Sequence, residues 1–107
     1  IVQPVTRTGL GVPAWHVATV LIDFDQANTD RATVMKELGK RGVGSQVLYM
    51  PLTRQPYYKK RYGKQHLPGA EAYYAKTLCL PLFASMTDGD IDRIVDALSA
   101  ALQVRAT

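Results

Sequence analysis

The pattern that most constrains the fold lies near the end of the chain, in the stretch TDGDIDRIVDALSAAL. Thr87 precedes Asp90 by three residues, the spacing of a capping box, in which each side chain accepts the other residue's backbone N–H at a helix start. Apolar residues then recur at helical spacing. The sequence therefore predicts an amphipathic helix that must bury one stripe against another layer. The stripe consists of Ile91, Ile94, Val95, Leu98, Ala101 and Leu102.

Three short runs are typical of β-strands. Residues 16–24, HVATVLIDF, place Ala18, Val20, Ile22 and Phe24 on one face and apolar residues on most of the other. A second strand is predicted over SQVLYM, residues 45–50, and is ended by Pro51. The third is TLCL, residues 77–80. Its cysteine is the only one in the chain, so no internal disulfide can form, and we interpret it as a packed strand residue in a reducing cytoplasm.

Two further helices are predicted between these strands. Thr29 or Asp30 can cap a helix with apolar positions at helical spacing, and Gly42 can take the left-handed position just after its end. Pro68 can open a short helix over GAEAYYAK. The expected order is strand, helix, strand, loop, helix, strand, helix. We therefore predict an α/β (α+β) fold, in which a small three-stranded sheet has helices packed on one face.

The domain organisation expected from these elements is simple. Residues 1–14, rich in Gly and Pro, are interpreted as a lead-in or linker, and residues 15–107 as one small domain. The chain does not begin with Met, which suggests a fragment of a longer or processed protein. Neither a secretory signal nor an apolar run long enough to cross a bilayer is recognisable in the sequence, so we expect no membrane partner.

Several motifs fail when their full pattern is tested. The acids from Asp88 onward resemble a calcium loop, but Arg93 and Ser99 stand where that loop needs Gly and Glu. Neither histidine belongs to a cluster of metal-binding side chains, so no metal site is expected. The short glycine patterns lack the strand and the third glycine of a phosphate-binding fingerprint.

The segment from Val43 to Gly63, VGSQVLYMPLTRQPYYKKRYG, holds four of the six tyrosines. The formal net charge is +4, and the cations of this region come without an intervening acid. Such rings and cations could stack on bases and follow a phosphate backbone. No recognition helix or RNA-binding signature accompanies them, and a solvated loop held down by tyrosine contacts is the simpler interpretation.

The same segment, followed by LPGAEAYYAKTLCLPLFASMTDGDIDRIVDAL, closely resembles the C-terminal part of the DegT/StrS family of sugar aminotransferases. The family pattern runs from a G-[IV]-G-x turn through Y-x-P-x-x-x-Q-P-Y-Y and P-x-A-E to L-x-L-P-L-F and M-T. Upstream, WHVATVLID resembles the strand that begins the family's small domain. The Q-P-Y-Y form is most similar to members that aminate the 4-keto position of UDP-linked 4,6-dideoxy sugars, as in the pseudaminic acid pathway.

The resemblance implies the small domain of the aspartate aminotransferase architecture (fold type I). Such enzymes are homodimers that use pyridoxal phosphate (PLP) to move an amino group, usually from glutamate, onto a keto sugar held as a nucleotide diphosphate. The lysine that binds the cofactor lies in the family's large N-terminal domain. This chain alone is therefore expected to bind no cofactor, to contain no catalytic residue and to be inactive. Its expected partners are the sugar nucleotide, the amino donor, its own large domain and a second subunit, and not nucleic acid.

The resemblance also implies a substrate-binding role for one set of residues, with tyrosines against the base or sugar and Arg54 near a phosphate or a donor carboxylate. Leu48 and Thr53 stand where many members have His, which leaves the identity of the sugar open. Two other classes of function remain open: a free-standing ligand-binding or regulatory module, and a nucleic-acid binder. The implied site residues are Tyr49, Thr53, Arg54, Gln55, Tyr57 and Tyr58.

Overall fold

The computed structural model of the chain describes residues 1–6 and 9–103. Residues 7–8 of the expected lead-in and residues 104–107 of the expected domain lie outside the described residues. The sheet is three-stranded and antiparallel, in the order β1-β2-β3. The elements are β1 (Val2–Pro4), β2 (Ala18–Ile22), α1 (Arg31–Lys40), the short 3-10 helix η1 (Leu52–Arg54), α2 (Pro56–Tyr62), α3 (Pro68–Lys76), β3 (Thr77–Leu80) and α4 (Asp88–Leu102).

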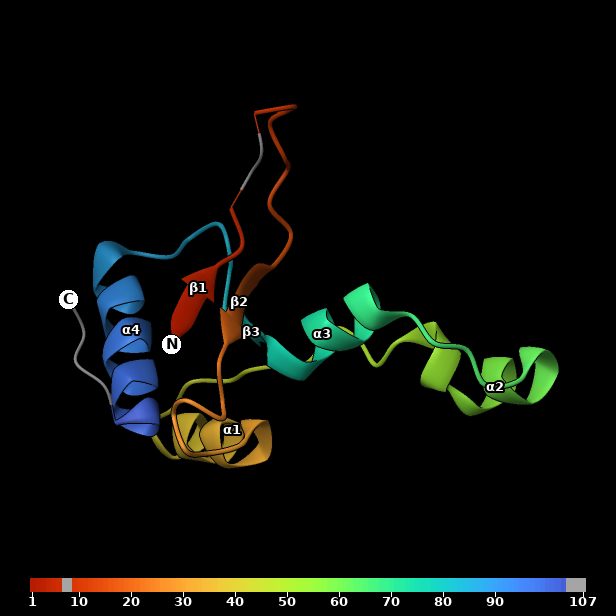
Figure 1. The fold of residues 1–107 in the computed structure, drawn as a ribbon. Coiled ribbons are helices and arrows are strands. Elements are labelled where there is room, and N and C mark those ends of the chain that lie inside the picture. The colour runs from red at the N-terminus through yellow and green to blue at the C-terminus, as the bar shows by residue number, and fades with distance from the viewer. Residues whose placement is uncertain (7–8, 104–107) are drawn as a thin grey trace.

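The register of the sheet separates its two faces as the sequence predicts. Val20 of the central strand lies opposite both Pro4 of β1 and Leu78 of β3. Because side chains alternate along a strand, Val20, Ile22 and Leu78 all point to the face that carries the hydrophobic core. The predicted α/β fold with a small three-stranded sheet is confirmed, and α1 and α4 cover the core face (Figure 1).

Helix α1 begins and ends through local interactions. Asp30, one of the two predicted caps, accepts the backbone N–H of Thr33 at 2.7 Å. At the other end Gly42 has φ = 77°, and the backbone N–H groups of Gly42 and Val43 donate to the carbonyls of Gly39 and Leu38. This is the Schellman arrangement, which needs a left-handed residue at the predicted glycine position. Val43 is thereby turned into the core beside Leu38.

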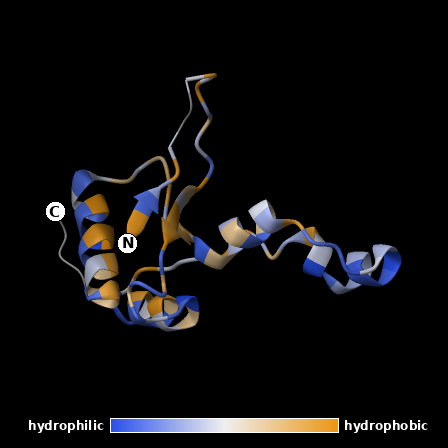
Figure 2. Ribbon diagram, viewed as in Figure 1, coloured by the Kyte–Doolittle hydropathy of each residue, from blue (hydrophilic) through white to orange (hydrophobic). Residues whose placement is uncertain are grey.

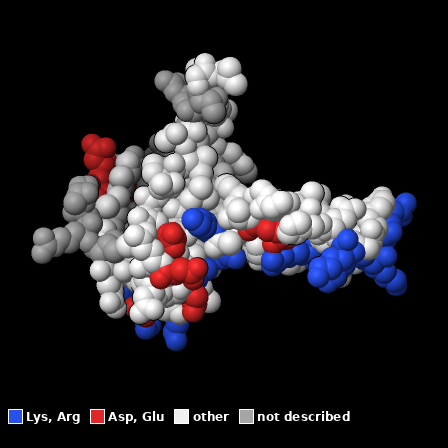
Figure 3. Space-filling view, viewed as in Figure 1, with Lys and Arg blue, Asp and Glu red and all other residues white. Residues whose placement is uncertain are grey.

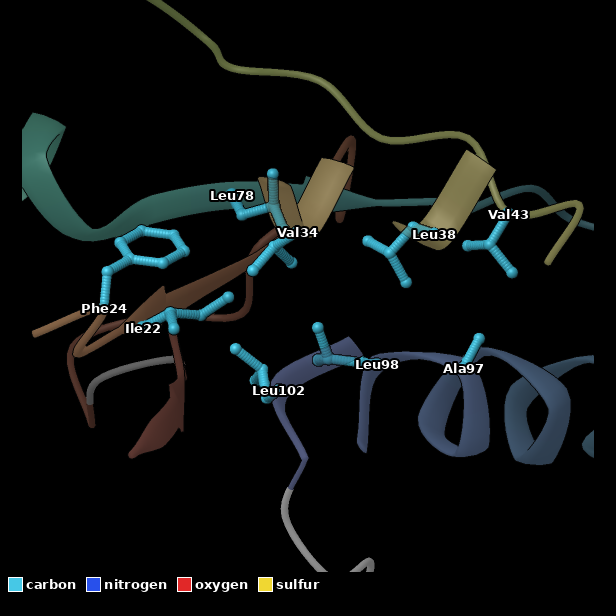
Figure 4. Packing of buried hydrophobic residues seen from close by; sticks show 9 residues of the cluster. All are labelled: Ile22, Phe24, Val34, Leu38, Val43, Leu78, Ala97, Leu98 and Leu102. Carbon is cyan, nitrogen blue, oxygen red and sulfur yellow. The ribbon is translucent and has the colours of Figure 1, made fainter. Parts of the chain in front are cut away.

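Helix α4 carries the predicted capping box. The Thr87 hydroxyl accepts the Asp90 N–H at 3.1 Å, and an Asp90 carboxylate oxygen accepts the Thr87 N–H at 3.0 Å. Figure 4 shows Leu98 and Leu102 pointing at the side chains of α1 and the sheet. The rest of the predicted stripe is only partly buried, since Ile91 and Val95 remain 49% and 45% exposed.

The predicted strand over residues 45–50 is wrong, because only Gln46 pairs with the outer edge of β3. Gln46 and Cys79 exchange both backbone hydrogen bonds, at 3.1 and 2.8 Å. The next bonds of such a ladder would involve residues 77 and 81. Pro81 has no N–H to give, and the Thr77 carbonyl accepts a hydrogen bond from the Arg31 guanidinium at 3.3 Å. Both continuations of the pairing are therefore blocked.

The third strand is instead β1, within the predicted lead-in. Its three residues are too few to display an alternation, and Pro4 argued against a strand. An edge strand tolerates proline, because one side of its backbone needs no partner. The flanking bonds, from Val5 N–H to the Thr19 carbonyl and from Asp23 N–H to the Ile1 carbonyl, tie the segment to β2.

The molecule is elongated. Its radius of gyration is 15.5 Å, against about 13 Å for a compact domain of 100 residues. One excursion is the connection from β1 to β2, where Leu10 and Val12 are 97% and 84% exposed. The other consists of η1, α2 and α3, called the arm below, and it extends away from the sheet (Figure 1). Figure 2 shows that its α2 end is largely hydrophilic. Within the described residues, no helix is both long and apolar enough to cross a bilayer.

Candidate functional site

The arm carries most of the predicted site residues. The sequence was interpreted there as a loop, and the structure instead forms η1 and α2. Pro56 occupies the first turn of α2, and Gly63, with φ = 74°, ends it. These two residues were the local signals for a helix. They were not matched by any apolar periodicity, because α2 buries no side chain.

Tyr49 lies before the arm, in a first pocket at the outer edge of β3. The pocket has a volume of about 470 Å³ and is lined by His16, the Gly44–Gln46 turn, Tyr49 and the β3 residues Cys79 and Leu80. The Tyr49 side chain is 72% exposed. A largely exposed ring beside a half-polar pocket can stack on a flat ligand and offer it a hydroxyl.

Thr53 and Arg54 line a second pocket, of about 580 Å³, called the arm pocket below. The Arg54 guanidinium pairs with both carboxylate oxygens of Glu71, at 3.0 Å from Nε and 2.5 Å from Nη2. It also lies 5.3 Å from the centre of the Tyr74 ring. The Arg31 guanidinium lies 4.6 Å from the same ring and donates to the Tyr74 carbonyl. Tyr74 thus links the arm to helix α1 of the core.

The remaining predicted residues have different surroundings. The Gln55 side chain donates to the Met50 carbonyl at 3.2 Å and so closes the turn that contains η1. Tyr57 and Tyr58 meet edge to face at 5.1 Å between ring centres, and the Tyr57 hydroxyl accepts a hydrogen bond from Arg61 at 3.4 Å. Both rings lie on the surface of α2 rather than being held down by contacts with the core.

The structure therefore divides the predicted site. Thr53 and Arg54 share the arm pocket, Tyr49 faces the first pocket, and the two α2 tyrosines line neither. Two lysines that sequence reasoning assigned to solvent, Lys59 and Lys64, also line the arm pocket, as does His66. Charge alone could not place them there, since nothing in the sequence says which cations face a cavity.

The described residues do not fit PLP. The cofactor needs a lysine amine in an enclosed site, whereas the lysines of this chain are all exposed. The carboxylate that lines the arm pocket, Glu71, is already paired with Arg54. Two carboxyl groups, Asp30 and Glu37, have a pKa below its ordinary value, because backbone and side-chain donors hydrogen-bond to them. Both are on or next to α1, and neither lines these two pockets. No group of His, Cys, Asp or Glu in residues 1–6 and 9–103 could hold a metal ion.

The sequence of residues 2–99 matches the model of the DegT/DnrJ/EryC1/StrS aminotransferase family. The chain belongs to this family. It is 34% identical over 91 residues to the spore coat polysaccharide biosynthesis protein SpsC of Bacillus subtilis, an alignment that covers 82% of this chain and 23% of SpsC. It is 36% identical over 87 residues to the uncharacterised protein MJ1066 of Methanocaldococcus jannaschii, covering 79% of this chain and 22% of that protein.

Several solved structures share the fold. Helicobacter pylori PseC, an aminotransferase involved in the biosynthesis of pseudoaminic acid, superimposes with a TM-score of 0.75 at 22% identity, covering 82% of this chain and 24% of PseC. The aminotransferase TlmJ of Streptoalloteichus hindustanus superimposes with a TM-score of 0.78 at 27% identity, covering 95% of this chain and 26% of TlmJ. NtdA of Bacillus subtilis, solved with the bound cofactor PMP, superimposes with a TM-score of 0.67 at 26% identity, covering 83% of this chain and 20% of NtdA. The chain has the small-domain fold of fold type I sugar aminotransferases and spans about a quarter of the length of its relatives.

Proposed function

We propose that this chain is the C-terminal small domain of a longer, cytoplasmic, PLP-dependent sugar aminotransferase. The observation that carries the proposal is the family match over residues 2–99 in a chain that spans only about a quarter of its relatives. In this proposal the domain occupies residues 15–107, and β1 from the lead-in completes its sheet. The larger part of the enzyme supplies the cofactor lysine.

The proposed reaction moves an amino group from glutamate to the keto group of a UDP-linked deoxysugar used in cell-surface glycan biosynthesis. PLP supplies the electron sink that lets an amino group leave the donor and enter the ketone. The exposed lysines and the pairing of Glu71 support the inference that the fragment alone is inactive. A homodimer is proposed from family resemblance, as are the donor and the UDP group.

The role of the small domain in this proposal is to shape the substrate pocket. Tyr49 has an accessible ring and hydroxyl for the base or the sugar, and Thr53 offers a hydroxyl in the arm pocket. Gln55 acts indirectly, by closing the turn before α2. Tyr57 and Tyr58 present a paired aromatic surface on α2 to the rest of the enzyme or to the substrate.

The visible absorption spectrum of the full-length protein tests the proposal. We expect a band of bound PLP that borohydride abolishes and that glutamate shifts to shorter wavelength. A protein without such a band, even after PLP is added, would contradict the proposal and would favour a free-standing binding module.

Kinetics of the full-length enzyme test the assigned residues separately. Tyr49→Ala should raise KM for the sugar nucleotide or lower kcat, because the ring is exposed to the first pocket and contributes little to the core. Val95→Ala is the control, because Val95 is a partly exposed apolar residue of α4 that lines neither pocket. Equal kinetics for Tyr49→Ala and wild type would remove Tyr49 from the site.

A further inference from the structure

The arm pocket gathers hydrogen-bond donors from three separate parts of the arm. Thr53 and Arg54 come from η1, Lys59 from α2, and Lys64 and His66 from the connection to α3. Gly63 makes this possible, because its left-handed conformation ends α2 and turns the chain so that Lys64 lines the same cavity as Lys59. We propose that the arm pocket is a binding site for a diphosphate group, held mainly by Lys59 and Lys64.

The charge of the pocket supports an anionic ligand. Arg54 and Glu71 neutralise each other through a two-point ion pair, so the formal charge left at the pocket is that of the two lysines. Of the ion pairs found among residues 1–6 and 9–103, none includes Lys59 or Lys64. Figure 3 shows Lys and Arg gathered over the α2 end of the arm, with acidic atoms only nearer the core.

The kind of donor distinguishes a diphosphate from a carboxylate. A carboxylate is best recognised by the planar fork of arginine, and here Glu71 already occupies that fork. Lysine ammonium groups act as separate point charges and suit a polyanion whose charge is spread over two groups. The Thr53 hydroxyl, the Gln65 amide and the His66 ring add further hydrogen-bond donors. The volume of about 580 Å³ lies within the range of roughly 300–1,000 Å³ for small-molecule sites.

Arg54 has a positioning role in this arrangement. Its guanidinium pairs with Glu71 and lies 5.3 Å from the centre of the Tyr74 ring, and these contacts fix η1 against α3 beside the pocket. This inference changes the assignment implied by the family resemblance, in which Arg54 lay near a phosphate or a donor carboxylate and the lysines were mainly solvated.

The inference deepens the proposed function and rests on it for the source of the ligand. If the protein is a nucleotide-sugar aminotransferase, the diphosphate is that of the substrate. Free inorganic pyrophosphate offers the same chemistry. The two sources can be separated by comparing UDP, uridine and inorganic pyrophosphate as probes.

The test is calorimetric titration of the full-length protein, saturated with PLP, with each of the three probes. Lys59→Gln and Lys64→Gln should each weaken UDP binding about tenfold, the loss expected when one charge-assisted contact is removed. Uridine binding should not change. Lys60→Gln is the matched control, because Lys60 is the next residue of the same exposed helix and does not line the pocket. Arg54→Gln leaves the Glu71 carboxylate unpaired in the pocket and removes one positive charge, so it should also weaken UDP binding.

Each outcome decides the proposal. If wild type, Lys59→Gln and Lys64→Gln bound both UDP and pyrophosphate with equal affinity, the proposal would be overturned. An equal loss in Lys60→Gln would also overturn it, because it would indicate non-specific charge attraction. Loss of pyrophosphate binding with unchanged UDP binding would assign the pocket to free pyrophosphate rather than to the substrate. Because titration needs no turnover, a protein without a PLP band could still show the lysine-dependent loss. In that case the proposed function would fail and the diphosphate site would stand.

Discussion

Replacing Thr77 by valine should stabilise the protein. Thr77 is fully buried at the start of β3, and its hydroxyl has no hydrogen-bond partner among the described residues. Leaving a buried hydroxyl unpaired costs about 1–3 kcal/mol. Valine has nearly the same shape and replaces the hydroxyl by a methyl group, which belongs in a buried site. We therefore expect Thr77→Val to raise the free energy of unfolding by about 1–2 kcal/mol.

Urea unfolding of the 107-residue chain, followed by circular dichroism, measures this change as a shift of the midpoint at constant slope. Hydrogen exchange of the β3 backbone amides in the full-length protein compares the stability of Thr77→Val with that of wild type in the same way. Thr77→Ser is the control, because it keeps the hydroxyl and loses the methyl group, and it should destabilise by about 1 kcal/mol. A valine variant less stable than wild type would refute the reasoning, since it would mean that the hydroxyl makes a hydrogen bond that stabilises β3.

Three further predictions concern the core and the ends of α1. Leu98→Ala should lower stability by about 2–5 kcal/mol, because it leaves a cavity between α4 and α1, and urea unfolding measures the loss. Gly42→Ala should cost about 1–2 kcal/mol for the left-handed conformation, and the new methyl would lie 2.7 Å from an Arg93 nitrogen. Adding Arg93→Ala to the Gly42→Ala variant should recover only the part of the lost stability that is due to the contact with Arg93. The Thr33 N–H lowers the pKa of Asp30 below 3.8. The stabilisation of the folded state by the Asp30 carboxylate is therefore complete above that pH and is lost as the pH falls through the folded-state pKa. The unfolding free energies of wild type and Asp30→Ala should converge in acid, which urea midpoints measured as a function of pH will show.

Features that depend on neighbouring residues could be predicted from the sequence. The capping box of α4 and the glycine-terminated end of α1 involve contacts between residues only a few positions apart. The strand pairing could not be predicted in the same way. Arg31 reaches the Thr77 carbonyl from 46 positions away and takes the place of a strand partner. β1, in turn, gains its partner only when the chain returns at β2.

The residues of the candidate site were implied by the family resemblance, because the proline and tyrosine pattern alone favoured a solvated loop. The structure places residues 49–58 beside two pockets or on the arm, and their role in substrate binding stays a prediction. The pairing of Arg54 with Glu71 joins residues 17 positions apart, and no local rule gives it. Lys59 and Lys64 were assigned to solvent because a charge run is usually a solvated face. The turn at Gly63, between the two lysines, lets Lys64 line the same cavity as Lys59.

Helix α2 has no buried side chains, and this makes it a site of limited proteolysis. A helix of seven residues is far shorter than the roughly 12–15 residues that an isolated helix needs for stability in water. Opening α2 exposes no core, so this opening is energetically separate from unfolding of the sheet. Trypsin can therefore cleave after Lys59, Lys60 or Arg61 while β2 and β3 remain paired. A ligand that bridges Lys59 and Lys64 would slow this cleavage without changing the melting temperature of the sheet.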